Sequence, residues 1–289
     1  MIALLRDADV AVIGLGVIGG SVALRLRDRG STVRGFSTSV ADRAEAQRAG
    51  VAVAATLDEA VRGVGLVLIA VPLGAISTVA DQVLGAAPTH ATILHAGSLQ
   101  RAEALEALPE VGARLIGTHP LAGSHRTGFA GARGDLFRDA TVFVEQRADA
   151  QQREDAEFFW SMAGAGRIEY ASASAHDDVM AWISHLPQLA STALGATLAE
   201  IVERIPNDEM LVKPGPGARD ATRLALSSLD MWHPILERAP AATVEVLRAL
   251  EGNVRHVRVA LEERDWPALR ELWTRAQTWR AAVEGGEST

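Results

Sequence analysis

The sequence predicts an α/β fold in which a doubly wound parallel sheet is followed by an all-helical part. Three observations lead to this prediction. From residue 9 to about residue 170, short β-like runs alternate with helix-like runs, and a glycine-rich turn follows the first of them. From about residue 171 the β-like runs stop and helical stretches take over. We therefore expect an N-terminal domain over residues 1–170 and a C-terminal domain over residues 171–289.

The β-like runs are short and largely apolar, as expected for strands that helices cover on both faces. The run Leu66–Val71 is apolar throughout, which predicts a central strand. Gly30 and Gly50 stand where helices would end, and glycine commonly follows the last residue of a helix. The predicted strands are Val10–Ile13, Thr32–Phe36, Leu66–Val71, Thr92–His95, Arg114–Gly117, Thr141–Glu145 and Arg167–Tyr170.

Gly14, Gly16 and Gly19 form a G-x-G-x-x-G pattern between the first predicted strand and a helix-like stretch. In a Rossmann-like domain the first glycine permits the tight turn, the second lets a pyrophosphate approach the backbone, and the third lets the helix pack on the strand. The free N–H groups at the helix start, around Val17 and Ile18, then face the phosphates. The pattern therefore predicts a dinucleotide site, and the alternative is a structural turn without a ligand.

The end of the second predicted strand bears on the choice of cofactor. Enzymes of this fold that bind NAD usually carry an acid there, whereas the 2′-phosphate of NADP requires hydrogen-bond donors or a cation. This chain has no acid at that position: Ser37, Thr38 and Ser39 offer hydroxyls, and Arg43 or Arg34 offers a positive charge. We expect NADP as the cofactor, with NAD as the alternative if the serines only cap the next helix.

Ligands of doubly wound sheets bind at the carboxyl ends of the strands. Val71 and Pro72 stand at the end of the predicted central strand and are expected to contact the cofactor. His119 comes directly after the predicted strand Arg114–Gly117, in the stretch Thr-His-Pro-Leu-Ala-Gly. A histidine at this edge titrates near neutral pH and can accept a hydroxyl proton as hydride leaves the same carbon. The alternative is a structural histidine.

Five of the six tryptophans lie in the predicted helical part, which is therefore rich in large apolar side chains. This density indicates more apolar surface than one chain can bury, and hence a homodimer joined through the helical domain. The alternative is that the tryptophans fill an ordinary helical core. The tryptophans concerned are Trp182, Trp232, Trp266, Trp273 and Trp279, and the predicted helices are His176–Glu203 with an interruption at Pro187, Ala218–Leu229, Pro234–Glu263 and Trp266–Val283.

Composition excludes several classes of partner and site. With 28 basic and 36 acidic residues the net charge is −8, and no basic block is present, so nucleic acid is not an expected partner. The absence of cysteine removes disulfides, thiolate catalysis and cysteine-based metal sites, and no metal is expected. No run of about 18 apolar residues and no signal peptide is found, so we expect a cytoplasmic protein that does not associate with membranes.

Several short motifs together resemble the prephenate/arogenate dehydrogenase family of tyrosine biosynthesis. Each motif alone is modest, but their order across residues 10 to about 260 makes the resemblance specific. It implies a dinucleotide domain, a helical domain that dimerises, and an active site in the cleft between them. The motifs are Gly14–Ser21, Gly97-Ser98, Thr118–Gly123, His176-Asp177, Ser184–Pro187 and Arg219–Arg223 followed by Met231-Trp232.

The resemblance also implies roles for individual residues. His119 would contact the ring hydroxyl of the substrate, and Ser98 would lie beside that hydroxyl and the nicotinamide. Arg223 would clamp a substrate carboxylate, because a guanidinium offers bidentate geometry and a permanent charge. The remaining residues expected to bind substrate are His185, Gln188, Trp232 and His125.

The chain departs from the family pattern at two places. Gln188 stands where the family often has a second histidine, and the family's Asp-x-Gly-Ser-x-Lys stretch begins here with His95 and ends with Gln100. These departures leave the reaction class unchanged but loosen the prediction of the substrate. The loop after His119 contains His125 and Arg126 but no acid that would pair with the ammonium of arogenate, which favours prephenate.

The sequence also leaves alternative functions. The close alternatives are arogenate dehydrogenase and 4-amino-4-deoxyprephenate dehydrogenase. A protein that senses dinucleotides without catalysis is disfavoured because His119, Ser98 and Arg223 are all present. A β-hydroxyacid or imine-reductase-like enzyme usually relies on a lysine or aspartate in the helical domain. The one lysine of this chain, Lys213, lies in a stretch rich in proline and glycine, which disfavours that reading.

Overall fold

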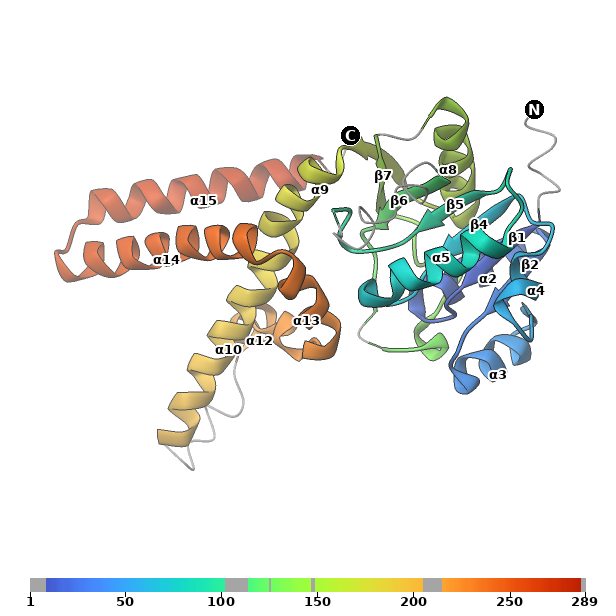
Figure 1. Cartoon of the computed structure of the whole chain (residues 1–289). Helices are drawn as coiled ribbons and strands as arrows, with labels where there is room; N and C mark the ends of the chain where they lie inside the picture. Colours follow the sequence, from blue (N-terminus) through green and yellow to red (C-terminus); the bar gives the residue numbers. More distant parts are fainter. Residues whose placement is uncertain (1–8, 102–113, 125, 147–148, 205–214, 287–289) are drawn as a thin grey trace.

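The computed structural model describes residues 9–101, 114–124, 126–146, 149–204 and 215–286. These residues form a sheet-containing part, in which helices flank one eight-stranded sheet, and a helical part beside it (Figure 1). The strand order is β3-β2-β1-β4-β5-β6-β7-β8. The strands are β1 (Val10–Ile13), β2 (Val33–Phe36), β3 (Ala52–Val53), β4 (Leu66–Ile69), β5 (Thr92–His95), β6 (Leu115–Pro120), β7 (Thr141–Glu145) and β8 (Arg167–Ala171).

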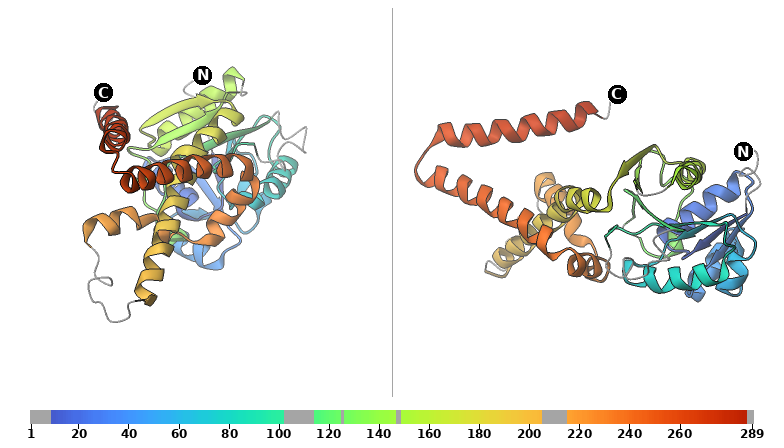
Figure 2. Two further views of the ribbon diagram at one scale, coloured as in Figure 1. Left: turned by 90° about the vertical axis from the view of Figure 1, so that its left-hand side faces the viewer. Right: turned by 45° about the horizontal axis from the view of Figure 1, so that its top comes forward.

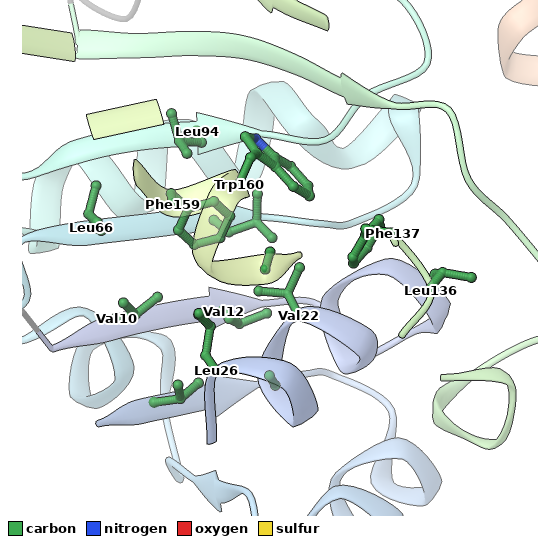
Figure 3. Packing of buried hydrophobic residues seen from close by; sticks show 14 of the residues in the cluster. Val10, Val12, Val22, Leu26, Leu66, Leu94, Leu136, Phe137, Phe159 and Trp160 are labelled. Carbon is green, nitrogen blue, oxygen red and sulfur yellow. The ribbon is translucent and has the colours of Figure 1, made fainter. Parts of the chain in front are cut away.

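Apolar side chains alternate along the central strands and fill two separate cores, one on each face of the sheet. On one face Val10 and Val12 of β1 pack with α2 (Val17–Asp28) and α8 (Ala150–Ala163), where Phe159 and Trp160 are buried (Figure 3). On the other face Ala11 and its neighbours pack against α4 (Leu57–Val61) and α5 (Ile76–Ala86). The helix α3 (Val40–Arg48) follows β2. This layering is the doubly wound arrangement that the sequence predicts.

The sheet differs from the predicted one at β3, which is not among the predicted strands, and at β6. The strand β6 pairs in parallel with β5 up to Gly117 and then antiparallel with β7 from Thr118 onward. His119 therefore lies inside a strand, not directly after one as predicted. The antiparallel pairing extends β6 beyond the end of β5, so His119 still lies at the carboxyl edge of the parallel strands.

A long loop ties the region after β6 to the first helices. Its 3-10 turn η2 (Phe129–Gly131) packs on α2, where a Cβ at Gly20 would lie 2.8 Å from Phe129. The Oδ1 atom of Asp42 in α3 accepts the backbone N–H of Phe129 at 2.8 Å. The hydroxyl of Ser21 in α2 accepts the backbone N–H of Arg133 at 2.9 Å. The chain segment that follows His119 is thus anchored beside the glycine-rich turn.

Beyond β8 every described element is helical. Figure 1 shows the last two helices extending away from the sheet, and the right-hand view of Figure 2 shows that they meet at their connecting turn and diverge from it. No helix among the described residues is long and apolar enough to cross a membrane. The helical elements are α9 (Ala173–Met180), the π-helical segment η3 (Ala181–His185), α10 (Leu186–Arg204), α12 (Pro216–Ala221), η4 (Arg223–Leu226), α13 (Leu229–Arg238), α14 (Pro240–Glu262) and α15 (Trp266–Gly286).

Two prolines make these helices differ from the predicted ones. Pro187 was expected to interrupt a helix, but the helix continues, because the Leu186 N–H bonds to the Ala181 carbonyl and forms a π turn. A proline has no N–H to donate, and a π turn accommodates the missing bond. Pro240 begins α14, so the predicted helix Pro234–Glu263 is two helices.

Candidate active site

The glycine-rich turn leaves the start of α2 open. Gly14 has a φ of +98°, and a Cβ there would lie 2.3 Å from the Ala70 carbonyl oxygen. A Cβ on Gly19 would lie 1.9 Å from the Gly14 carbonyl oxygen, whereas a Cβ on Gly16 would meet nothing within 4 Å. No side chain caps α2, and its first turn contains no acid. The free N–H groups of this turn, which includes Val17 and Ile18, therefore suit the pyrophosphate of a dinucleotide.

The end of β4 closes the other side of this turn. Val71 contributes a Cγ1 atom 3.1 Å from the position of a Cβ on Gly14. Pro72 is exposed and precedes the 3-10 turn η1 (Leu73–Ala75). From the helical part, a guanidinium nitrogen of Arg238 lies 3.6 Å from the position of a Cβ on Gly74. The two parts of the chain therefore meet beside the predicted cofactor residues Val71 and Pro72.

Ser37, Ser39 and Arg43, which follow β2, are held by hydrogen bonds within this segment. Ser39 caps α3, since its hydroxyl accepts the N–H of Asp42 at 3.2 Å. Ser37 is buried and its carbonyl accepts a hydrogen bond from Arg43, whereas Thr38 is exposed. Ser37, Thr38 and Arg43 thus lie together at the end of β2.

Arg34 has a different place. Its guanidinium donates to the carbonyls of Glu59 at 2.8 Å and Arg62 at 2.6 Å, at the end of α4. The alternative that Arg34 supplies positive charge beside the strand end is therefore not supported. Arg43 remains the candidate for that charge.

His119 belongs to a chain of hydrogen-bonded side chains that joins the two parts of the molecule. Its Nδ1 atom lies 2.9 Å from Nε2 of His176 in α9. The Nδ1 atom of His176 lies 2.8 Å from Oδ1 of Asp177. Asp177 also accepts the backbone N–H groups of Gln100 at 2.9 Å and Arg101 at 2.8 Å. A single carboxylate thus contacts the histidine chain and the loop that carries Ser98.

Burial keeps His119 neutral. Desolvation, with a smaller contribution from the nearby His176, lowers the pKa of His119 from 6.5 to about 3. Burial by itself would raise the pKa of Asp177, but its hydrogen bonds from His176, Gln100 and Arg101 outweigh this effect and hold the pKa below its usual value. His119 therefore does not titrate near neutral pH, contrary to the prediction from the sequence. At neutral pH the site combines an ionised carboxylate with a neutral imidazole, which has one unprotonated ring nitrogen.

His95 and Gln100, the two departures from the family stretch, lie under the Ser98 loop. His95 is buried, its Nδ1 accepts the Gly97 N–H at 3.2 Å, and desolvation lowers its pKa to about 4. The Gln100 amide donates to the Gly97 carbonyl at 3.0 Å. Its Oε1 atom is buried without a partner among the described residues and would lie 1.8 Å from a Cβ on Gly117. These two positions therefore form a neutral, buried support for Ser98, which is itself partly exposed.

The π-helical segment places His185 in the same region. His185 is buried, its Nδ1 lies 3.3 Å from the Thr243 hydroxyl, and its ring meets the ring of Trp232 edge-on at 5.9 Å. Burial lowers the pKa of His185 below its usual value. The nearby Asp177 raises this pKa and the nearby His176 lowers it, but burial has the largest effect. The indole N–H of Trp232 is buried and has no partner among the described residues. His185 and Trp232 are thus brought together near the His119 chain.

Gln188 and Arg223 both lie at the turn η4, but Gln188 is buried whereas Arg223 is exposed. The Gln188 amide is buried and donates to the Leu224 carbonyl at 2.8 Å, so it holds the 3-10 turn η4 against α10. Arg223 begins that turn and is exposed. It forms no ion pair with any residue that the structure describes. The structure therefore shows a supporting contact for Gln188 and, within the described residues, an exposed guanidinium without an ion pair for Arg223.

Two residues considered from the sequence, His125 and Lys213, lie outside the described residues. Arg126 is exposed, so it does not strengthen the preference for prephenate that rested on the two cations of this loop. In the sequence, His176 and Asp177 stand out only as part of a motif, and no role was predicted for them. Their signal was a histidine followed by an acid just after the last predicted strand, where the sheet gives way to helices.

Comparisons with known proteins agree with this architecture. Residues 22–169 match the family described as prephenate dehydrogenase, nucleotide-binding domain, and residues 172–275 match prephenate dehydrogenase, dimerization domain. The chain is 31% identical over 284 residues to cyclohexadienyl dehydrogenase of Zymomonas mobilis. The matched region covers 95% of this chain and 96% of that protein.

Two solved structures share the fold. Prephenate dehydrogenase from Aquifex aeolicus, in complex with hydroxyphenyl propionate and NAD+, has a TM-score of 0.85 and 23% identity over 96% of this chain and 98% of that one. Arogenate dehydrogenase of Synechocystis has a TM-score of 0.78 and 23% identity over 95% of this chain and 99% of that one.

The glycine-rich turn allows a matched test with two alanine substitutions. Gly16→Ala should leave thermal stability unchanged, because its Cβ meets open space, but should weaken dinucleotide binding about tenfold or more by projecting toward the phosphates. Gly19→Ala should lower the free energy of unfolding by about 1–3 kcal/mol, because its Cβ clashes with backbone. Thermal melts and dinucleotide titrations measure the two effects. Equal dinucleotide affinity in Gly16→Ala and the unchanged protein would contradict a phosphate site at this turn.

Proposed function

The chain belongs to the prephenate dehydrogenase family, and from this premise we propose that it oxidises and decarboxylates prephenate, with a nicotinamide dinucleotide as hydride acceptor, to give 4-hydroxyphenylpyruvate. The observation that supports this most is the position of His119. It is a neutral histidine at the carboxyl edge of the sheet, on the strand that runs beyond its parallel neighbour, and is bonded to the helical part. This is where a ligand of a doubly wound sheet binds.

The reaction asks little covalent chemistry of the protein. Loss of hydride from the hydroxyl-bearing carbon and loss of carbon dioxide make the substrate ring aromatic, which drives the reaction. When bound, the nicotinamide ring supplies the hydride acceptor. The protein has to orient the substrate, take the hydroxyl proton and hold the carboxylates. We assign the proton to Nε2 of His119, because Nδ1 is engaged with His176.

Other residues of the candidate site supply groups that could hold the substrate carboxylates and orient the substrate. Arg223 is an exposed guanidinium whose geometry suits a substrate carboxylate in bidentate fashion. Ser98 follows β5 at the same edge as His119 and is held there by the Asp177 contacts. We assign it to the substrate hydroxyl. His185 and Trp232, whose rings contact each other, belong to the helical part, and we assign them to substrate binding. We retain His125 as a proposed substrate contact on the sequence alone.

Gln188 leaves arogenate as the alternative substrate. Its amide is neutral and already bonded to the Leu224 carbonyl, so it adds no positive charge for the keto-acid side chain of prephenate. The exposed Arg126 does not replace that charge. The related proteins include both a prephenate and an arogenate dehydrogenase. The product of the alternative reaction would be tyrosine.

We infer NADP as the preferred dinucleotide. The start of α2 suits its pyrophosphate, because the turn has open space at Gly16 and neither a cap nor an acid. At the ribose end, the exposed hydroxyl of Thr38 and the guanidinium of Arg43 lie with Ser37, where NAD enzymes usually place an acid. NAD remains the alternative, and the Aquifex aeolicus structure contains NAD+.

We also infer a homodimer joined through the helical domain, with the domain boundary near residue 170, where β8 gives way to α9. The family match of the helical part is to a dimerization domain. In the single chain this part leaves large apolar side chains exposed, including Trp182, Trp266, Trp273 and Trp279, so these tryptophans do not fill its core. Such exposed apolar surface favours association with a second copy.

Steady-state assays with prephenate and arogenate, each with NADP and NAD, test the proposed reaction. Prephenate with NADP should give the highest kcat/KM. His119→Asn should lower kcat by about 10²–10⁴-fold with little change in dinucleotide affinity, because it removes the proton acceptor and leaves the cofactor turn intact. A loss below threefold would remove His119 from the chemistry. A protein inactive with both substrates and both cofactors would contradict the proposed function.

The choice of cofactor depends on the residue after Phe36. Ser37→Asp should lower kcat/KM with NADP and preserve or raise it with NAD, because a carboxylate repels a 2′-phosphate and accepts hydrogen bonds from ribose hydroxyls. The matched control is Ser39→Asp, which keeps an N-cap acceptor for α3 and places the same charge two residues along. A preference of the unchanged protein for NAD by more than tenfold would refute the NADP pocket.

The homodimer is tested by light scattering at micromolar concentration, which should give twice the mass of the chain. Trp273→Glu, on an exposed position of α15, should shift the equilibrium toward the monomer, because a charge opposes burial in an apolar interface. The matched control is Arg275→Glu on the same helix, which alters a residue that is already charged. A monomer in the unchanged protein would contradict the proposed interface.

A further inference from the structure

We propose that His176 and Asp177 are positioning residues that fix the tautomer of His119, so that its Nε2 atom carries the lone pair facing the substrate. This inference rests on the proposed function for its last clause only. The tautomer itself follows from the order of donors and acceptors in the hydrogen-bonded chain. His176 and Asp177 touch neither substrate nor cofactor in this scheme and act through His119.

The order of donors begins at Asp177. Its carboxylate accepts the backbone N–H groups of Gln100 at 2.9 Å and Arg101 at 2.8 Å, and backbone N–H groups can only donate. An ionised carboxylate has no hydrogen to give, so the 2.8 Å contact with Nδ1 of His176 requires the imidazole to donate. When the His176 ring carries a single proton, that proton sits on Nδ1 and its Nε2 is an acceptor.

The hydrogen bond between His176 and His119 then determines which nitrogen of His119 carries the proton. Nε2 of His176 accepts, so the 2.9 Å contact requires Nδ1–H of His119 to donate. A neutral His119 with its proton on Nδ1 has an unprotonated Nε2. This is the minor tautomer of free histidine, whose proton prefers Nε2. The chain from Asp177 thus selects the form of His119 that is able to accept a hydroxyl proton.

Packing holds the intermediate ring in the orientation that this chain needs. His176 is 2% exposed. Its ring meets Phe143 of β7 edge-on at 5.2 Å and 73°, and meets His119 at 5.1 Å and 73°. Phe143 is the residue that pairs with His119 across the β6–β7 ladder. The same pair of strands therefore positions the acceptor histidine and the aromatic ring that orients its partner.

The matched substitution for the test is adjacent in the sequence. Asp178 carries the same charge but is exposed, and its Oδ2 lies 3.4 Å from Nη2 of Arg101 in an exposed pair. Asp177→Asn and Asp178→Asn therefore remove one carboxylate each from neighbouring positions. Only the first replaces the carboxylate of the histidine chain by an amide, which has one acceptor oxygen for the three donors that Asp177 now satisfies. His176→Phe keeps an aromatic ring against Phe143 and removes both nitrogens.

The experiment uses the full-length protein labelled with ¹⁵N-histidine, and ring correlation spectra identify which nitrogen of His119 carries the proton. His119→Asn assigns the signal. Unchanged protein and Asp178→Asn should show an unprotonated Nε2, whereas Asp177→Asn and His176→Phe should show the proton moving to Nε2. In the same two variants kcat should fall about 10²-fold, with KM for prephenate and dinucleotide affinity within about threefold, since a wrong tautomer affects turnover more than binding. His176→Gln, whose carbonyl can still accept from Nδ1–H, should recover part of the loss.

The outcomes separate this inference from the proposed function. A proton on Nε2 of His119 in the unchanged protein would overturn the inference, as would an unaltered tautomer in both Asp177→Asn and His176→Phe. Thermal melts show whether these two variants are folded. If they are not, the spectrum of the unchanged protein still shows which nitrogen of His119 carries the proton. The expected spectra with no turnover of either substrate would support the positioning role and overturn the proposed reaction.

Discussion

The carboxylate of Asp177 is the contact on which the arrangement of the site depends. It lies in α9, the first helix beyond the sheet, yet it accepts hydrogen bonds from the backbone after β5 and from the side chain that contacts β6. Few acceptors other than a carboxylate can satisfy three donors at once in a buried place. The loop of Ser98 and the ring of His119 are therefore located relative to each other by a residue from the helical part.

Much of the sheet-containing part could be predicted from sequence because its signals are local. The apolar run Leu66–Ile69 and the glycines after β1 describe a strand and a turn without reference to the rest of the chain. The pairing of β6 with β7 could not be predicted in this way, since antiparallel pairing of its second half depends on a strand more than twenty residues away. The prediction that His119 follows a strand was wrong for that reason.

The site shows the same division between local and distant causes. The start of α2 follows from the glycine pattern, and His119 was singled out by its place near a strand end. The role of His176 could not be read from the sequence, because it depends on which histidine nitrogen meets it across 57 residues of chain. Likewise, the capping of α4 by Arg34 uses carbonyls of residues 59 and 62, so its side chain looked free when only the strand end was considered.

The space shared by Gln100 and Gly117 links a position in the loop after β5 with a position in strand β6. The Gln100 amide oxygen occupies the place that a Cβ of residue 117 would need, at 1.8 Å. A larger residue at position 117 is therefore compatible with the fold only when residue 100 is shorter or turned away. Among relatives, these two positions should vary as a pair, with glycine at 117 wherever a long side chain at position 100 takes this path.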